Sequence, residues 1–336
     1  MTPKDVITMD IEKVDIMENK ILLMDKSLLE ILLSDRTTSK NILWCTDNYN
    51  NYGIGYNYLQ QIRVELITGK NGNVIKPRVR KSKKEQKSRI KDKAEVFTSS
   101  WACNHQNNQI DSLWFGRDNV FNIEKNEGWE VIIDKISFDK LEKTWQDYVS
   151  DKRLEISCGE APYIVSRYDT VTGEILEPVK RIGILDRKIR IINENADNDD
   201  WFYWIKKAYQ SVYGYEWQGD SLLIARESLL YSFLDYHYEK FQSLPSLEMQ
   251  REIAEIISWN FWQMDGLKGV IPLSCDNEKV IQVNLFGEDV TVQCEGCKYS
   301  IINKHNGIYC LIKEWTDKKG KPKVHRYIDL IDKGVI

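Results

Sequence analysis

The sequence predicts an α/β protein with a mostly parallel sheet, and two observations carry this prediction. Three apolar segments have the length of strands and lie within residues 153–163, 212–216 and 258–265. Between them, apolar residues recur at helical spacing, as in helices that cover a sheet. Strands that alternate with helices along a chain are typical of parallel sheets with crossover connections.

The composition favours a protein with a hydrophobic core and without a membrane-spanning segment. Of the 336 residues, 42% are hydrophobic and 29% are charged, which suits one large domain with smaller attached regions. No apolar run is long enough to cross a bilayer, and the first residues lack the apolar segment of a signal peptide. We therefore expect a cytoplasmic protein that has no membrane partner.

The N-terminal part is expected to be mixed. Apolar residues at helical spacing predict one or two helices within residues 10–35. Short apolar runs at 39–45 and 62–67 predict strands, and a Gly-Lys-Asn-Gly turn follows at 69–72. A further helix is expected at 101–115.

Residues 70–93 form a strongly basic segment. It contains eleven Lys and Arg residues against two acidic residues, a local excess of nine positive charges. Such a segment often contacts the phosphate backbone of a nucleic acid, although a solvated surface helix can have the same composition. The candidate nucleic-acid contacts are Arg78, Arg80, Lys81, Lys83, Lys84, Lys87 and Arg89.

The remaining elements are expected to surround the three strands. Residues 116–150 look irregular and end in a helix, and residues 169–200 look like an insertion that ends in a polar loop. From residue 280 on, short strand-like runs around turns predict a small β-rich module. The expected helices lie near 138–149, 201–212, 220–237 and 247–257.

Each of the three predicted strands ends in a candidate ligand-binding feature. The first runs into the turn Cys158-Gly159, the second ends at Glu216 and the third at Asp265. A parallel sheet brings such strand ends to one edge, where a turn can approach a nucleoside and a carboxylate can accept hydrogen bonds from ribose hydroxyls. Acidic residues at strand ends are also common without a ligand, so a purely structural role stays open.

In their order along the chain, these segments resemble the N6-adenine DNA methyltransferases, and more narrowly the modification subunits of restriction systems. The resemblance lies in Phe97-Thr98, in Leu154-Glu-Ile-Ser-Cys-Gly-Glu-Ala-Pro-Tyr-Ile164, in Tyr213-Gly-Tyr-Glu216 and in Asp265. It implies a Rossmann-like methyltransferase sheet that binds S-adenosylmethionine, with the turn around the methionine part and Glu216 on the ribose. The cofactor-binding residues that it implies are Phe97, Thr98, Glu155, Cys158, Gly159, Tyr163, Glu216 and Asp265.

The chain departs from the pattern of that family at four places, one of which is the long spacing from Gly159 to Glu216, so residues 169–200 would be an insertion. Ser99 replaces a proline and Ala161 replaces a second glycine, so Ala161 would be strained if its φ is positive. The Asn-Pro-Pro-Tyr motif that holds the target adenine is missing, because the chain contains no Pro-Pro pair; Asn284-Leu-Phe286 is the nearest shape. The catalytic residues therefore stay unassigned. The chain would be either a non-catalytic relative or one part of a split enzyme.

The resemblance and the composition together divide the chain into three regions. Residues 1–93 are a helical and mixed region that ends in the basic segment. Residues 94–272 are the methyltransferase-like domain, and residues 273–336 are a small β-rich module. The partners expected on this basis are DNA and a second methyltransferase or restriction subunit that supplies the catalytic loop. The alternative is a non-catalytic DNA-binding or assembly subunit.

The C-terminal module carries a candidate zinc site. The seven cysteines make a poor disulfide framework, and four of them lie near the C-terminus. Cys294 and Cys297 form a Cys-x2-Cys knuckle that Gly296 allows to turn, and His305 and Cys310 follow as the third and fourth ligands. Cys275 is a spare candidate. A small β module with buried thiols is the alternative interpretation.

Overall fold

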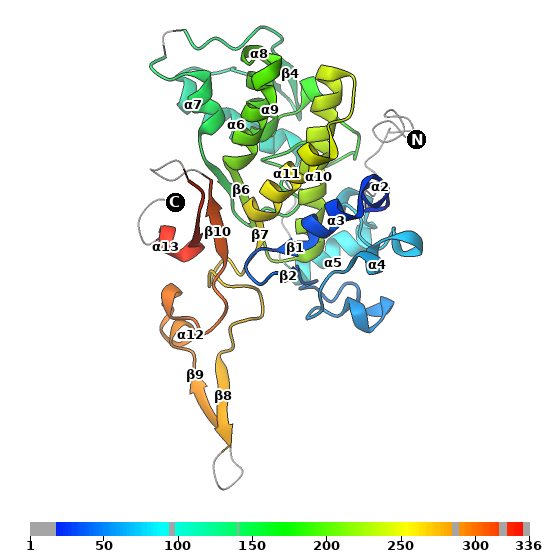
Figure 1. The fold of residues 1–336 in the computed structure, drawn as a ribbon, viewed down its shortest axis with the longest axis vertical. Coiled ribbons are helices and arrows are strands. Elements are labelled where there is room, and N and C mark those ends of the chain that lie inside the picture. Colours follow the sequence, from blue (N-terminus) through cyan, green and yellow to red (C-terminus); the bar gives the residue numbers. More distant parts are fainter. Residues whose placement is uncertain (1–17, 94–97, 140, 284–288, 316–320, 332–336) are drawn as a thin grey trace.

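The protein is an α/β structure with a central three-stranded parallel sheet. The computed structural model describes residues 18–93, 98–139, 141–283, 289–315 and 321–331. Strands β5 (Arg153–Glu155), β6 (Val212–Glu216) and β7 (Phe261–Gln263) pair in that order, both pairs parallel. The predicted α/β class and the three parallel strands are therefore confirmed (Figure 1).

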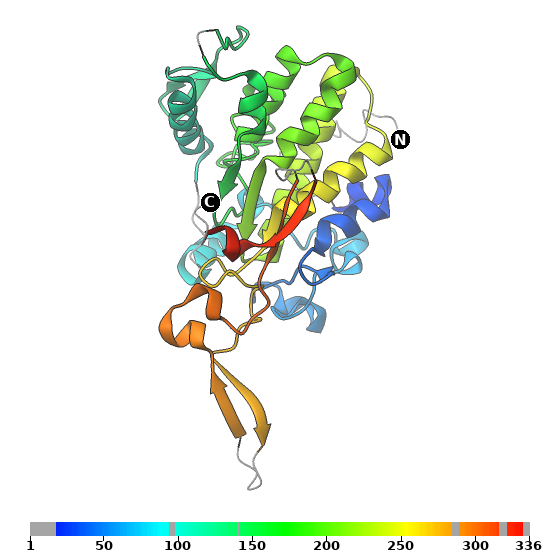
Figure 2. The same cartoon turned by 60° about the vertical axis from the view of Figure 1, so that its left-hand side comes forward.

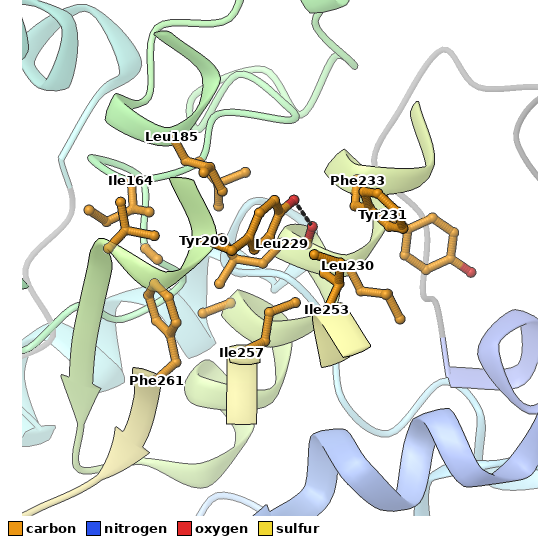
Figure 3. Packing of buried hydrophobic residues seen from close by; sticks show 14 of the residues in the cluster. Ile164, Leu185, Tyr209, Leu229, Leu230, Tyr231, Phe233, Ile253, Ile257 and Phe261 are labelled. Atoms are coloured by element: carbon orange, nitrogen blue, oxygen red, sulfur yellow. Dashed lines mark hydrogen bonds between the residues drawn. The ribbon is translucent and has the colours of Figure 1, made fainter. Parts of the chain in front are cut away.

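Helices connect the three strands and pack on one face of the sheet. Helices α8 (Ile184–Asn195) and α9 (Asn198–Gln210) lie between β5 and β6, and α10 (Gly219–Phe241) and α11 (Leu247–Asn260) lie between β6 and β7. Side chains from these helices form one buried cluster with Phe261 of β7, and Tyr209 donates a 2.8 Å hydrogen bond to the Leu229 carbonyl in its centre (Figure 3). Burial of this apolar surface is the main force that holds the helices on the sheet.

The C-terminal strands cover the other face of the sheet. Tyr213, Tyr215 and Trp262 pack there against Ile312 and Tyr327. These partners come from the antiparallel pair β10 (Leu311–Glu314) and β11 (Lys323–Arg326) and from α13 (Tyr327–Ile331). Figure 2 shows this red pair crossing the green strand β6. The molecule is thus layered as helices, sheet and hairpin.

Two further groups of elements complete the structure. The pair β8 (Glu278–Val283) and β9 (Asp289–Gln293) forms an arm that projects from the body (Figures 1 and 2). The others are α2 (Glu18–Met24), α3 (Lys26–Leu33), β1 (Ser34–Asp35), β2 (Lys40–Asn41), α4 (Val64–Ile67), α5 (Lys83–Lys93), α6 (Ser100–Phe115), β3 (Asn122–Lys125), β4 (Gly128–Val131), α7 (Trp145–Ser150) and α12 (Glu295–Tyr299).

The buried Arg226 of α10 ties the N-terminal region to the sheet. Its Nε donates to the Phe261 carbonyl at 2.8 Å, and its Nη1 donates to the Ser34 carbonyl at 3.0 Å and to the Leu32 carbonyl. The Ser258 carbonyl also accepts from its Nη2, at 3.3 Å, so four carbonyl oxygens receive donors from one guanidinium. The start of β7 and the end of α3 are held together in this way.

Some predicted elements are wrong. The run at 62–67 contains helix α4 in place of a strand, because an apolar run of this length fits either structure. The expected insertion at 169–200 contains the whole of α8, whose apolar residues recur with helical spacing from Ile184 to Ile192. Residues 116–150, expected to be irregular, contain the hairpin of β3 and β4. In the described part of the chain, no helix is long and apolar enough to span a membrane.

Gly214 in the middle of β6 is required by close packing. A Cβ atom there would lie 2.8 Å from Cε1 of Phe261 and 3.1 Å from Sγ of Cys158. We therefore expect Gly214→Ala to lower the free energy of unfolding by about 2 kcal/mol, measured by urea denaturation. Gly128→Ala in β4 is the matched control, because a Cβ there meets nothing within 4 Å. Equal stabilities of the two variants would contradict this packing.

Candidate functional site

A cavity of ≈ 730 Å³ opens at the carboxyl ends of β5 and β6. The turn after β5 forms one wall and the residues after β6 form another. Ligands of open α/β sheets bind at this end of the strands. The lining residues are Cys45, Arg78, Val79, Thr98, Glu155, Ile156, Ser157, Cys158, Gly159, Glu160, Pro162, Tyr163, Val165, Tyr168, Thr170, Glu216, Trp217, Gln218 and Ser221.

The turn after β5 has an unusual backbone. The φ angles of Ser157, Gly159 and Ala161 are 48°, 55° and 59°, so three alternating residues are left-handed. Ala161 therefore has the positive φ that would strain an alanine, and this backbone conformation is unfavourable by about 1–2 kcal/mol. Buried contacts hold it, since the Ala161 N–H donates to the Cys158 carbonyl at 2.7 Å and the Ala161 side chain is fully buried.

Glu216 holds this turn at the end of β6. Its Oε2 accepts a 2.9 Å hydrogen bond from the Gly159 N–H, and its Oε1 accepts one of 3.1 Å from the Gln218 N–H. Burial raises the pKa of Glu216, and these N–H groups partly oppose that rise. The turn and the acid that the sequence singled out are thus in direct contact. Each carboxylate oxygen keeps lone-pair capacity for a further donor.

Glu155 is a half-buried acid, and one of its carboxylate oxygens is an unused acceptor. Its Oε2 is buried and has no hydrogen-bond partner in the structure. Burial raises the pKa of Glu155 to about 8, partly offset by the backbone N–H groups of Tyr163 and Ile164. An unpaired buried carboxylate is costly. A ligand that carries an ammonium group would supply both a donor and a positive charge at this point.

The pKa of Glu155 predicts a pH-dependent stability difference. The pKa is raised on folding, so its stabilising contribution is complete below about pH 4.5 and is lost as pH rises through about 8, at up to about 1.4 kcal/mol per pH unit. We expect Glu155→Gln, which has no such titration, to gain stability relative to the wild type between pH 5.5 and pH 8.5. Urea denaturation at both pH values measures this gain. A constant difference between the two proteins would contradict the raised pKa.

The other predicted cofactor residues divide into three groups. Thr98, Cys158 and Tyr163 line the cavity together with the turn and the two acids. Asp265 is not among the described lining residues; its Oδ1 accepts from the N–H groups of Leu267 and Lys268, at 3.0 and 3.2 Å, and so closes the turn after β7. Phe97 lies outside the described residues.

Sequence reasoning missed Trp217 and the residues that follow it. Trp217 lines the cavity beside Glu216, and its indole N–H donates to the Cys45 carbonyl at 3.2 Å. Gln218 and Ser221 extend the same wall. An aromatic residue directly after a strand-end acid was the available signal for Trp217. Cys45 gave no signal, because it comes from a loop more than a hundred residues away.

A second candidate site is a cluster of three thiols and one imidazole. Cys275, Cys294, Cys297 and His305 offer ligand atoms that all lie within 4.8 Å of one another. The Sγ atom of Cys275 is 3.7 Å from that of Cys294 and 3.6 Å from that of Cys297. The Nδ1 atom of His305 is 3.5 Å from the Sγ of Cys275 and 3.6 Å from that of Cys297.

These separations fit a tetrahedral metal ion. With Zn–S bonds of about 2.3 Å, two sulfurs of a zinc tetrahedron lie about 3.8 Å apart. Cys₃His is a common structural zinc set. The cluster could therefore hold a metal such as zinc, with four protein ligands and no open position.

Cys310 is not a ligand, so the predicted ligand set is wrong in its fourth member. Cys310 is fully buried in the core beneath β10, where its thiol lies 3.4 Å from the Gln263 carbonyl. Cys275 takes the fourth place. Gly296 is needed here, because a Cβ atom on it would lie 2.6 Å from both the backbone N and the Nδ1 of His305.

The structure separates the basic segment into surface and interior residues. Arg80, Lys83, Lys84 and Lys87 are exposed and Arg78 is half-buried, but Lys81 and Arg89 are buried. Arg89 donates to Oδ2 of Asp220 at 2.8 Å, and the ammonium of Lys81 lies 3.6 Å from the same oxygen. Lys81 and Arg89 therefore do not lie on the protein surface with the other lysines and arginines of the segment, because a buried acid holds them inside the protein.

Comparison of the chain with family models, with curated proteins and with solved structures found no significant match. The function must therefore be argued from the two sites themselves.

Proposed function

We propose that this protein is the S-adenosylmethionine-binding subunit of an adenine-N6 DNA methyltransferase of the restriction-modification type, whose catalytic loop comes from a partner chain. The observation that carries the proposal is the contact between the glycine turn after β5 and Glu216 after β6, beside a cavity of ≈ 730 Å³. This pairing of a turn with a strand-end acid is the general arrangement of nucleoside sites in α/β proteins.

The residues present fit the cofactor. Glu155, with its unpartnered buried oxygen, would accept from the ammonium of the methionine part. Glu216 would accept from ribose hydroxyls, and Trp217 offers an aromatic surface next to it. S-adenosylmethionine, when bound, supplies an activated methyl group. The protein's own residues orient it and exclude water from it.

The sheet itself supports a role for a second chain. Among the described residues, no strand pairs with the outer edge of β5. The Arg153 N–H points toward β6, because it donates to the Ser211 carbonyl, so the main-chain groups of Leu154 face the outer edge. Ile156, the first residue after β5, has a side chain that is 66% exposed. An added strand could pair with this edge and bring the missing Asn-Pro-Pro-Tyr motif beside the cavity.

A thermal-shift experiment tests the cofactor class. At a concentration of one hundred times Kd, a ligand that binds only the folded chain adds about 2.7 kcal/mol to its stability. We expect S-adenosylmethionine and S-adenosylhomocysteine to raise Tm by about 5 °C, and ATP at the same concentration to leave it unchanged. A shift with ATP but not with S-adenosylmethionine would sink the proposal.

The alternative is a DNA-binding or assembly subunit in which the methyltransferase-like domain is a scaffold. The observation that favours it is the Cys₃His cluster at the base of the projecting arm. This alternative predicts no shift with either methionine cofactor. It would then be tested by removing the arm residues and measuring retention of the partner chain.

A further inference from the structure

A second cavity, of ≈ 360 Å³, lies between the N-terminal turn of α5 and a tyrosine-rich loop. It shares a wall with the first cavity, since Arg89 lines it and donates at 3.1 Å to Gln218 and at 3.3 Å to Ser221, which line the first. Its lining residues are Asn48, Tyr49, Asn51, Tyr52, Val74, Lys76, Lys81, Lys84, Glu85 and Arg89.

Lys81 is the unusual residue of this cavity. It is 8% exposed, and its Nζ is buried without a hydrogen-bond partner. The nearest opposite charge is Oδ2 of Asp220, 3.6 Å away. That oxygen already accepts from the Tyr49 hydroxyl and from Arg89, each at 2.8 Å. A buried ammonium with three donors therefore has none of them satisfied, which is costly unless a ligand accepts from it.

The lining is strongly cationic. Lys76, Lys84 and Arg89 line the cavity together with Lys81, whereas Glu85 is the single carboxylate among the described lining residues. The Oε2 of Glu85 accepts from the Ser82 N–H at 2.7 Å at the start of α5; hydrogen bonds from Ser82, together with the nearby Lys76 and Lys81, lower the pKa of Glu85. Burial opposes ionisation of Asp220, yet Arg89 and Lys81 hold its pKa well below the ordinary range. Positive charge thus exceeds negative charge here, and the first turn of a helix adds to it.

The rim of the cavity carries an accessible aromatic ring. Tyr52 lines the cavity and is 52% exposed, whereas Tyr49 is buried against Trp44, with ring centroids 4.7 Å apart. The amide side chains of Asn48 and Asn51 lie in the same wall. Cationic side chains next to an exposed aromatic ring are how proteins hold a single nucleic-acid strand, with phosphate on the cations and a base on the ring.

We propose that this cavity binds one phosphate group of a single-stranded segment of DNA, with Lys81 as its innermost donor, Lys76 and Lys84 at its mouth and Tyr52 stacked on the neighbouring base. The identity of the ligand as DNA rests on the proposed function. The phosphate supplies the acceptors that the Lys81 ammonium lacks. Because Arg89 lies between the two cavities, the bound DNA would lie next to the first cavity.

The test is fluorescence anisotropy of the full chain with a labelled 12-nucleotide single strand of DNA at low salt. We expect Lys81→Met and Lys76→Met each to weaken binding at least tenfold. Lys87→Met is the matched control, because it removes the same charge from an exposed position outside the cavity; we expect a change below threefold. Tyr52→Ala should weaken binding about tenfold. Inorganic phosphate should displace the oligonucleotide from the wild type.

Two outcomes would overturn the proposal: a wild type that does not bind the oligonucleotide, or Lys76→Met and Lys81→Met variants that bind like Lys87→Met. Lys76→Met keeps the test valid if the buried Lys81 variant fails to fold. The thermal shift with S-adenosylmethionine is measured on the same samples. If the wild type does not bind the oligonucleotide but S-adenosylmethionine still raises its Tm, only the proposed phosphate cavity is overturned. If oligonucleotide binding depends on Lys76 and Lys81 but S-adenosylmethionine does not raise Tm, the phosphate cavity is supported and the methyltransferase assignment is wrong.

Discussion

Replacing Cys275 with serine is expected to abolish tight zinc binding and to unfold the C-terminal module. Cys275 lies just before β8 and Cys294 directly follows β9, so one metal ion would join both ends of the projecting arm. An isolated two-stranded hairpin is marginally stable in water, whereas structural zinc contributes about 10–16 kcal/mol of apparent binding free energy in small zinc-binding peptides. The ion would therefore supply most of the stability of this part of the chain.

The measurement is zinc content by atomic absorption after gel filtration, with limited proteolysis of the same sample. We expect about one ion per wild-type chain and almost none in Cys275→Ser, which should also be cleaved within the module. Cys310→Ser is the control: it perturbs the core beneath β10 but leaves the four ligands in place. If Cys310→Ser lost the metal and Cys275→Ser kept it, the ligand set given by the geometry would be wrong.

Replacing Glu216 with alanine is expected to weaken S-adenosylmethionine binding about one hundredfold. The change removes the acceptor for the ribose, and hydrogen bonds to a charged group are worth about 1.5–3 kcal/mol. It also removes the acceptor of the Gly159 N–H, so the turn loses its support. Calorimetric titration of the variant measures the loss.

Asp265→Ala is the matched control for Glu216→Ala. Asp265 is also a strand-end acid, but its carboxylate closes a local turn and is not among the described residues that line the cavity. We expect its affinity for S-adenosylmethionine to stay within threefold of the wild type. An equal loss of affinity in both variants would show that Asp265 belongs to the binding site, as the resemblance to the methyltransferase family implies.

The sequence predicted those parts of the structure that depend on local pattern. The period of apolar residues identified β6 and most of the helices around it, because these elements are long or fully buried. The Cys-x2-Cys knuckle and the turn at Cys158-Gly159 were also visible, since each is a short motif with a fixed spacing. The resemblance to a family that has a glycine at this place marked Ala161 as a position where a positive φ would be strained.

Features that depend on distant residues could not be predicted. Cys275 joins the metal cluster across the β8–β9 arm, and nothing in its own surroundings distinguishes it from Cys310. Lys81 and Arg89 look like surface charges until Asp220, more than a hundred residues away, is placed beside them. The short helix α4 was missed for another reason, because a few apolar residues fit either a helix or a strand.

The central claim is that the cavity between the turn after β5 and Glu216 holds S-adenosylmethionine. Calorimetric titration of the full wild-type chain with this cofactor tests it most directly. We predict one site per chain with a micromolar Kd, about −8 kcal/mol, and a loss of that heat signal in Glu216→Ala. A wild-type chain that takes up no S-adenosylmethionine, or a Glu216→Ala variant that binds it as tightly as the wild type, would contradict the assignment.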